Sequence, residues 1–137
     1  MPQFMSDAWV SALTERLNNS AAYKSAGKGW KTTLALAVLP EPEKSIEAAA
    51  MVIALEDGAC KHVERIEGPG PYEAEYVIRG LAENWKKLLT KEVFPVPAIM
   101  KGDLQLVKGG TTALMMKMNA VQALLDEAGA VPTEYSA

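Results

Sequence analysis

The spacing of apolar residues changes along the chain from a helical period to a period of two. A first helix is predicted behind Ser6, a residue type that caps helix N-termini, because apolar residues then recur at helical spacing: Trp9, Val10, Leu13 and Leu17. A short turn over residues 21–26 follows and ends at Gly27 and Gly29. From residue 31 apolar and small residues alternate, which predicts strands.

Four strands are predicted in this middle region, over residues 31–38, 45–56, 60–67 and 73–79. The second is mostly small or apolar, which favours an inner position, although its three alanines also suit a helix. The third carries mixed charges, which favours an edge. Asp57-Gly58 predicts the hairpin turn between them. In the fourth strand, Ala74 is expected to share one face with Tyr76 and Ile78.

The second half of the chain returns to the helical period. Leu81, Trp85, Leu88 and Leu89 form one helical face, and Pro95 and Pro97 then predict a break. A fifth strand is predicted over residues 104–107. Gly109-Gly110 turns the chain into a last helix, which Thr111 or Thr112 would cap. Its apolar stripe is Leu114, Met118, Val121 and Leu125, widened by Met115. The tail after Gly129 has no period and is expected to fray.

The order of these elements predicts the fold class. Consecutive strands joined by short turns favour a largely antiparallel, five-stranded sheet, and the helices must then cover one face of it. We therefore expect an α+β fold in a single domain over residues 1–137, a length suited to one hydrophobic core.

Charge and composition narrow the function classes. The net charge of −3 does not favour nucleic-acid binding. Residues 85–117 nevertheless hold six lysines and two acids, a pattern that suits an anionic headgroup, a phosphate or a membrane surface, or merely a solvated basic face. The first residues lack a signal-peptide pattern, and no apolar run approaches the ~20 residues of a membrane span. We expect a cytoplasmic protein without stable membrane insertion.

Few residues suggest catalysis. His62 is the only histidine and lacks the partners of a metal site or a catalytic triad. Cys60 is the only cysteine, which excludes an intrachain disulfide and favours a buried structural thiol. The acidic pairs suit solvated turns, and the glycines at 27 and 29 lack the rest of a phosphate loop. The run from Lys108 to Thr112 suits either an anion site or simple capping. We expect no catalytic residue, no metal and no cofactor, so an enzyme is the least favoured class.

The densest apolar set lies between residues 85 and 125. Its members are Trp85, Leu88, Phe94, Ile99, Leu104, Leu106, Leu114, Met115, Met118, Val121 and Leu125. Such a set is either core or the lining of a ligand cavity, and its pattern alone favours core. The methionines suit a cavity, because an unbranched, polarisable side chain adapts to variable apolar shapes.

Four segments in this region resemble the sterol carrier protein 2 family. They are Trp85-Lys86-Lys87-Leu88-Leu89, Ala98-Ile99-Met100, Gly102-Asp103-Leu104-Gln105-Leu106-Val107-Lys108-Gly109 and the Leu/Met-rich helix after them. They match that family's Trp-containing helix, linker, Gly-x-Leu-x-Leu/Ile-x-x-Gly strand and amphipathic helix. The resemblance covers nearly the whole chain, and its last third is the distinctive part.

The resemblance implies a tunnel between the sheet and its helices that holds fatty acids, acyl-CoA, sterols or other lipids. The residues matching its pocket-forming segments are Trp85, Leu104, Leu106, Leu114, Met115, Met118 and Val121. The leading hypothesis is therefore a non-catalytic lipid carrier, with lysines at 86, 87, 101 and 108 near the headgroup. The alternative is an interaction or homodimerisation module that uses the same apolar surface. The final residues, Glu134-Tyr135-Ser136-Ala137, do not form a Ser-Lys-Leu-type peroxisomal signal.

Overall fold

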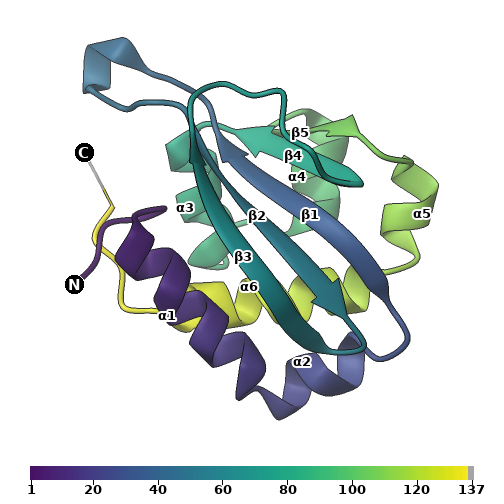
Figure 1. Cartoon of the computed structure of the whole chain (residues 1–137). Helices are drawn as coiled ribbons and strands as arrows, with labels where there is room; N and C mark the ends of the chain where they lie inside the picture. The colour runs from purple at the N-terminus through teal and green to yellow at the C-terminus, as the bar shows by residue number, and fades with distance from the viewer. Residues whose placement is uncertain (136–137) are drawn as a thin grey trace.

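The computed structural model describes residues 1–135 of the 137-residue chain as a sheet with helices on one face (Figure 1). Its helices are α1 (Asp7–Asn18), α2 (Ala21–Ala26), α3 (Ala82–Leu89), α4 (Pro95–Lys101), α5 (Thr111–Met115) and α6 (Met118–Ala130), with a short 3₁₀ helix, η1 (Pro42–Lys44). Its strands are β1 (Lys31–Val38), β2 (Ala49–Glu56), β3 (Ala59–Glu67), β4 (Tyr76–Gly80) and β5 (Leu104–Lys108).

The five strands form one mixed sheet in the order β3-β2-β1-β4-β5. All neighbouring pairs are antiparallel except β1 and β4, which are parallel. The prediction of an α+β fold with a five-stranded, mostly antiparallel sheet is confirmed. The inner position of β2 and the edge position of β3 are confirmed as well.

Local signals account for most element boundaries in the first half. Ser6 Oγ accepts a hydrogen bond from the backbone N–H of Trp9 at 3.2 Å, which caps α1 as predicted. Asp57 and Gly58 both have positive φ, the geometry that a two-residue hairpin turn requires. The second strand begins at Ala49, four residues later than predicted, because residues 41–46 form η1 and a small bridge between Glu41 and Ile46.

Three predictions near β4 and α4 are wrong. The fourth strand begins at Tyr76 rather than at residue 73, and Ala74 packs on the opposite face of the sheet from Tyr76 and Ile78. Pro95 and Pro97 do not break the chain but lie in the first turn of α4. Proline is tolerated there because the first N–H groups of a helix have no partner inside the helix.

The end of the chain also differs from its prediction. The last helix is divided into α5 and α6, and no threonine side chain caps α5, whose N-cap is Gly110. The bond from Lys117 N–H to Leu114 carbonyl, at 2.9 Å, closes a turn between the two helices. The tail to residue 135 is not frayed, because Glu134 forms backbone hydrogen bonds with Pro2 and Phe4. Residues 136–137 of that prediction lie outside the described residues.

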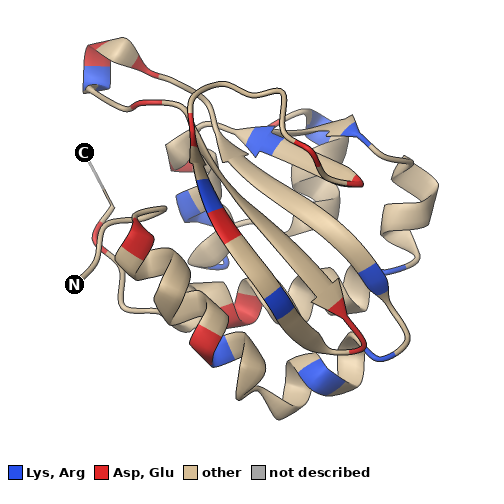
Figure 2. Cartoon of the chain, viewed as in Figure 1, with Lys and Arg blue, Asp and Glu red and all other residues tan. Residues whose placement is uncertain are grey.

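The two faces of the sheet bury different side chains. The face toward the helices buries leucine, isoleucine, methionine and tyrosine, which pack against Trp9 of α1 and Trp85 of α3. The opposite face buries mainly alanines, namely Ala35, Ala37 and Ala50, together with Val77, Tyr72 and Ala74. In Figure 2 the middle of β1 and β2 carries no charge, whereas charges lie at strand ends, on β3, on loops and on the helices.

Candidate functional site

The candidate site is an apolar cavity between the sheet and helices α3, α4 and α6. The strands contribute Leu34, Leu36, Ile78 and Leu104 to its lining. The helices contribute Trp85, Leu88, Pro95, Ile99, Val121, Leu124 and Leu125. No charged side chain lines it, so the cavity can attract an apolar group but has no group for acid–base or nucleophilic chemistry.

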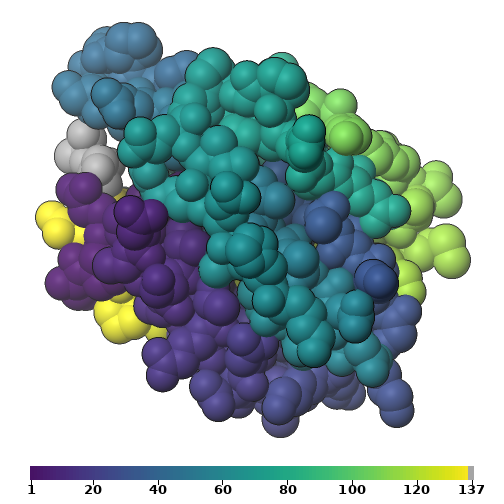
Figure 3. Space-filling view, viewed as in Figure 1, coloured from purple at the N-terminus to yellow at the C-terminus, as the bar shows by residue number. Residues whose placement is uncertain are grey.

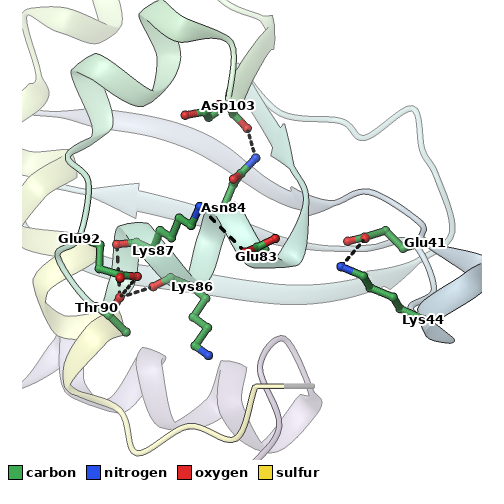
Figure 4. Close-up of polar contacts among 9 residues, drawn as sticks. All are labelled: Glu41, Lys44, Glu83, Asn84, Lys86, Lys87, Thr90, Glu92 and Asp103. Carbon is green, nitrogen blue, oxygen red and sulfur yellow. Dashed lines mark hydrogen bonds and ion pairs between the residues drawn. The ribbon is translucent and has the colours of Figure 1, made fainter. Parts of the chain in front are cut away.

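Trp85 uses its one polar atom to hold α3 against the sheet. Its side chain is 2% exposed, and its indole Nε1–H donates to the carbonyl of Ala37 at 2.9 Å. The bond satisfies the polar group of a large buried ring and ties α3 to the middle of the sheet. Asn84 adds a second tie, since its Nδ2 donates to the carbonyl of Asp103 at 3.1 Å (Figure 4).

The structure brings six of the eleven predicted lining residues together at the cavity. These are Trp85, Leu88, Ile99, Leu104, Val121 and Leu125. Leu114 is fully buried, while Leu106 and Met118 are partly buried against the same core. Met115 is half-buried outside the cavity lining, and Phe94 is 55% exposed.

Five further residues that line the cavity lie outside the predicted set: Leu34, Leu36, Ile78, Pro95 and Leu124. The alternation of β1 and β4 already places the first three on one strand face. The pattern does not reveal that this face meets the helices. Pro95 was missed because a break, and not a helix, was expected there.

Side chains fill the cavity almost completely. Its volume is about 10 Å³, which is the space of roughly one water molecule. A site for an elongated ligand usually measures ~300–1,000 Å³. The closely packed interior is therefore far too small for a lipid tail without movement of its walls.

The lysines of the basic region do not gather around this cavity. Lys86 and Lys87 extend in different directions from α3 (Figure 4). Lys87 pairs with Glu83 at 4.0 Å, and the Lys86 ammonium lies 5.5 Å from the centre of the Tyr135 ring. Lys108 lines a cleft on the opposite face of the sheet.

A separate surface cleft of about 460 Å³ lies between the N-terminal segment, residues 41–47 and α3. It contains Glu41, which is 7% exposed and whose Oε2 pairs with Lys44 Nζ at 3.4 Å (Figure 4). Its other oxygen, Oε1, has no hydrogen-bond partner among the described residues. Nothing in the sequence pattern indicated that this glutamate would be buried.

Cys60 and His62, the only cysteine and histidine of the chain, show no sign of a catalytic role. Cys60 is buried, and burial raises the pKa of its thiol, which keeps it protonated and unreactive at neutral pH. His62 is exposed on β3. Within residues 1–135, no group of histidine, cysteine and acidic side chains has the arrangement of a metal site. Within the same range, no helix has the length and apolar character to cross a membrane.

Two solved structures resemble the chain closely. A structure described as sterol carrier protein 2 superposes with a TM-score of 0.86 and 35% sequence identity, over 93% of this chain and 98% of the other. A protein from Thermus thermophilus, described as possibly sterol carrier protein, gives a TM-score of 0.86 and 34% identity over 98% of this chain and 93% of the other. No protein-family model and no curated protein matches the sequence.

The chain therefore has the fold of a sterol-carrier-type domain. At this identity and coverage, it belongs to the sterol carrier protein 2 family. The same fold also occurs inside a larger enzyme. A double mutant of the sec-alkyl sulfatase PisA1 matches with a TM-score of 0.53 and 17% identity, over 83% of this chain and 16% of the other. That likeness concerns the fold alone.

Proposed function

We propose that the protein is a non-catalytic carrier that holds the apolar tail of a long-chain lipid between its sheet and helices α3, α4 and α6. The observation that carries this proposal is a cavity lined entirely by apolar side chains in a chain of this family. Burial of the tail, at ~25 cal/mol per Å² of apolar surface, would supply most of the affinity.

Binding requires the cavity to widen from about 10 Å³. Helix α4 is the wall best suited to move. Of its residues only Pro95 and Ala98 are buried, and Met100 is 79% exposed. The helix lies between Lys91 and Gly102, which both have positive φ and therefore sit at turns of the chain. Displacing α4 would remove Pro95 and Ile99 from the lining and open the interior beside Trp85.

The alternative function, interaction through the same apolar surface, has less support. Six of the eleven residues proposed for that surface are buried: Trp85, Leu88, Leu104, Leu114, Val121 and Leu125. A partner would have to reach them through the same opening that a lipid needs. Of the eleven, Phe94 alone is more than half exposed.

The first test is extraction of the purified protein with organic solvent, followed by mass spectrometry, together with titration of a fluorescent long-chain fatty acid. The variant Val121→Phe adds a ring to the lining, and overpacking of this kind costs ~1–3 kcal/mol. We expect it to bind the fatty acid at least tenfold more weakly while circular dichroism shows a folded protein.

Met116→Phe is the matched control, because Met116 is 80% exposed and outside the cavity lining. It should bind the fatty acid as the wild type does. The proposal fails if the wild type carries no lipid and does not bind the fatty acid. It also fails if both variants bind as tightly as the wild type.

A further inference from the structure

A larger cleft lies on the face of the sheet that carries no helix. Its volume is about 550 Å³, which is within the range of small-molecule sites. Residues 68–75, here called the strap, run over this face between β3 and β4 (Figure 1). The cleft lies between the strap and the edge of the sheet formed by β5. Figure 3 views the molecule from this side.

The cleft exists because the sheet has small side chains where the strap crosses it. Ala37 and Ala48 form part of its floor, and Tyr72 of the strap forms one wall. The strap is attached at both ends, since Gly68 N–H donates to Ala48 carbonyl at 2.9 Å and Glu75 N–H donates to Thr33 carbonyl at 3.1 Å. Within the strap, the Tyr72 hydroxyl donates to the carbonyl of Gly68, which fixes the ring in place.

A β-bulge in β5 places Lys108 at the cleft. The register of β4 and β5 shifts between Val77 and Ile78, so that Leu106 pairs with Ile78 while Lys108 pairs with Val77. Val107 is the extra residue of this bulge, and both Val107 and Lys108 line the cleft. Bulges of this kind redirect side chains and are common beside functional sites.

Arg79 supplies a second cation to the cleft. Its Nε donates to Gln105 Oε1 at 2.8 Å, which orients the guanidinium and leaves its terminal nitrogens for another acceptor. No acidic side chain lines the cleft. Neither Arg79 nor Lys108 has an ion-pair partner within residues 1–135. Glu75, the acid of the strap that is nearest to β4 in sequence, accepts a hydrogen bond from the hydroxyl of Thr32.

We propose that this cleft binds a small organic anion whose apolar body lies on the alanine floor against Tyr72, with its oxyanion group between Arg79 and Lys108. An arginine already oriented by one hydrogen bond suits an oxyanion, which accepts two parallel N–H bonds. This site is separate from the interior cavity, since the sheet itself lies between them.

The test uses two fluorescent probes with a similar aromatic body, anilinonaphthalene sulfonate and the uncharged phenylnaphthylamine. The double variant Arg79→Gln with Lys108→Gln removes both cations from exposed positions, so the fold should be unaffected. We expect it to bind the sulfonate at least tenfold more weakly and the uncharged probe within about twofold of the wild type. Sulfonate binding by the wild type should also weaken as salt rises, because both cations are exposed.

Two controls test whether the sulfonate binds at this cleft. Lys24→Gln with Lys28→Gln changes the net charge equally on exposed residues of α2 and the turn after it, and should leave sulfonate binding unchanged. Val121→Phe fills the interior cavity and should also leave it unchanged. The inference is overturned if the wild type does not bind the sulfonate, if the two charge variants behave alike, or if Val121→Phe abolishes sulfonate binding.

Discussion

The two faces of the sheet contrast in how they use space. The face toward the helices carries large apolar side chains such as Leu34, Leu36 and Ile78, and they fill the interior down to a void of about 10 Å³. The opposite face carries alanines at neighbouring positions of β1 and β2, covered by one strap, and leaves a cleft of about 550 Å³. The more apolar face is thus the fuller one, because large side chains from several helices interlock there.

Apolar side chains therefore have a different role on each face of the sheet. On the helix side, apolar side chains supply stability, and a ligand would have to displace a packed wall. On the strap side, small side chains supply room, and Arg79 and Lys108 supply charge. The lipid-carrier proposal therefore depends on motion of α4, whereas the anion cleft requires no movement of the backbone.

The largest expected effect tests how much stability the helix side supplies. Trp85→Ala removes a ring that is 2% exposed together with its hydrogen bond to Ala37, so it should lower the free energy of unfolding by ~3–5 kcal/mol. Val107→Ala, on the strap side and 48% exposed, should change it by less than ~0.5 kcal/mol. Urea denaturation followed by circular dichroism measures both. If the two variants lost similar free energies of unfolding, the helix side would not be the main source of stability.

A smaller effect tests how closely the helices approach one another. Gly129 in α6 faces the backbone of α3, and a Cβ there would lie 2.3 Å from the carbonyl oxygen of Leu89. Alanine normally stabilises a helix relative to glycine by ~1 kcal/mol. Here we expect the opposite sign, a loss of ~1–3 kcal/mol from overpacking, measured as a lower urea midpoint.

Gly110→Ala serves as the control for this substitution. Its added Cβ would meet only Ala113 Cβ, at 3.8 Å, and its φ of −81° is accessible to alanine. Because Gly110 is the N-cap of α5 and alanine is a poorer N-cap than glycine, a loss of at most ~1 kcal/mol is expected, smaller than that of Gly129→Ala. If Gly129→Ala stabilised the protein, the close packing of α6 on α3 would be refuted.

The smallest expected effect is on stability at alkaline pH, and it is tested with one tyrosine on each face of the sheet. Burial, with a smaller contribution from the Cys60 thiolate, raises the pKa of Tyr23 on the helix side to about 12, and burial raises the pKa of Tyr72 in the strap. In the unfolded chain tyrosine titrates near pH 10, so between ~10 and 12 the unfolded state holds fewer protons than the folded state. Stability that is fully present below pH 10 must therefore fall as the pH rises through this window.

Tyr23→Phe should leave stability at pH 7 nearly unchanged and make this alkaline loss shallower, as measured by urea midpoints from pH 8 to 12. Tyr72→Phe removes the hydrogen bond to Gly68, worth ~0.5–1.5 kcal/mol, and should therefore lower stability already at neutral pH. An alkaline loss of the same slope in wild type and Tyr23→Phe would show that other groups cause it.

Much of the fold was predictable because its signals are local. The cap at Ser6, the hairpin turn at Asp57-Gly58 and the alternation of β1 depend on residues within a few positions of one another. The errors occur where the same residues permit two local structures. Prolines at 95 and 97 suit either a break or the first turn of a helix, and which one forms depends on whether Ala98 and Ile99 can pack beneath the sheet.

The candidate site was predictable only in part, for the same reason. Helix periodicity identified Trp85, Leu88, Val121 and Leu125, which all line the cavity. Phe94 was chosen from the same dense apolar region, but it is exposed. The prediction failed because spacing along the chain cannot distinguish a residue at the edge of an element from one buried beneath it. The strand residues of the lining, Leu34 and Leu36, became part of the site only through the pairing of β1 with β4, which is distant in sequence.

The type and order of most elements, the apolar character of the interior and the resemblance to the sterol carrier protein 2 family follow from the sequence alone. These depend on composition and spacing, which are properties of short segments. How much space remains inside depends on the tertiary structure, because a void is the difference between the volume that the backbone encloses and the volume that side chains fill. That difference is nearly zero beneath the helices and large beneath the strap.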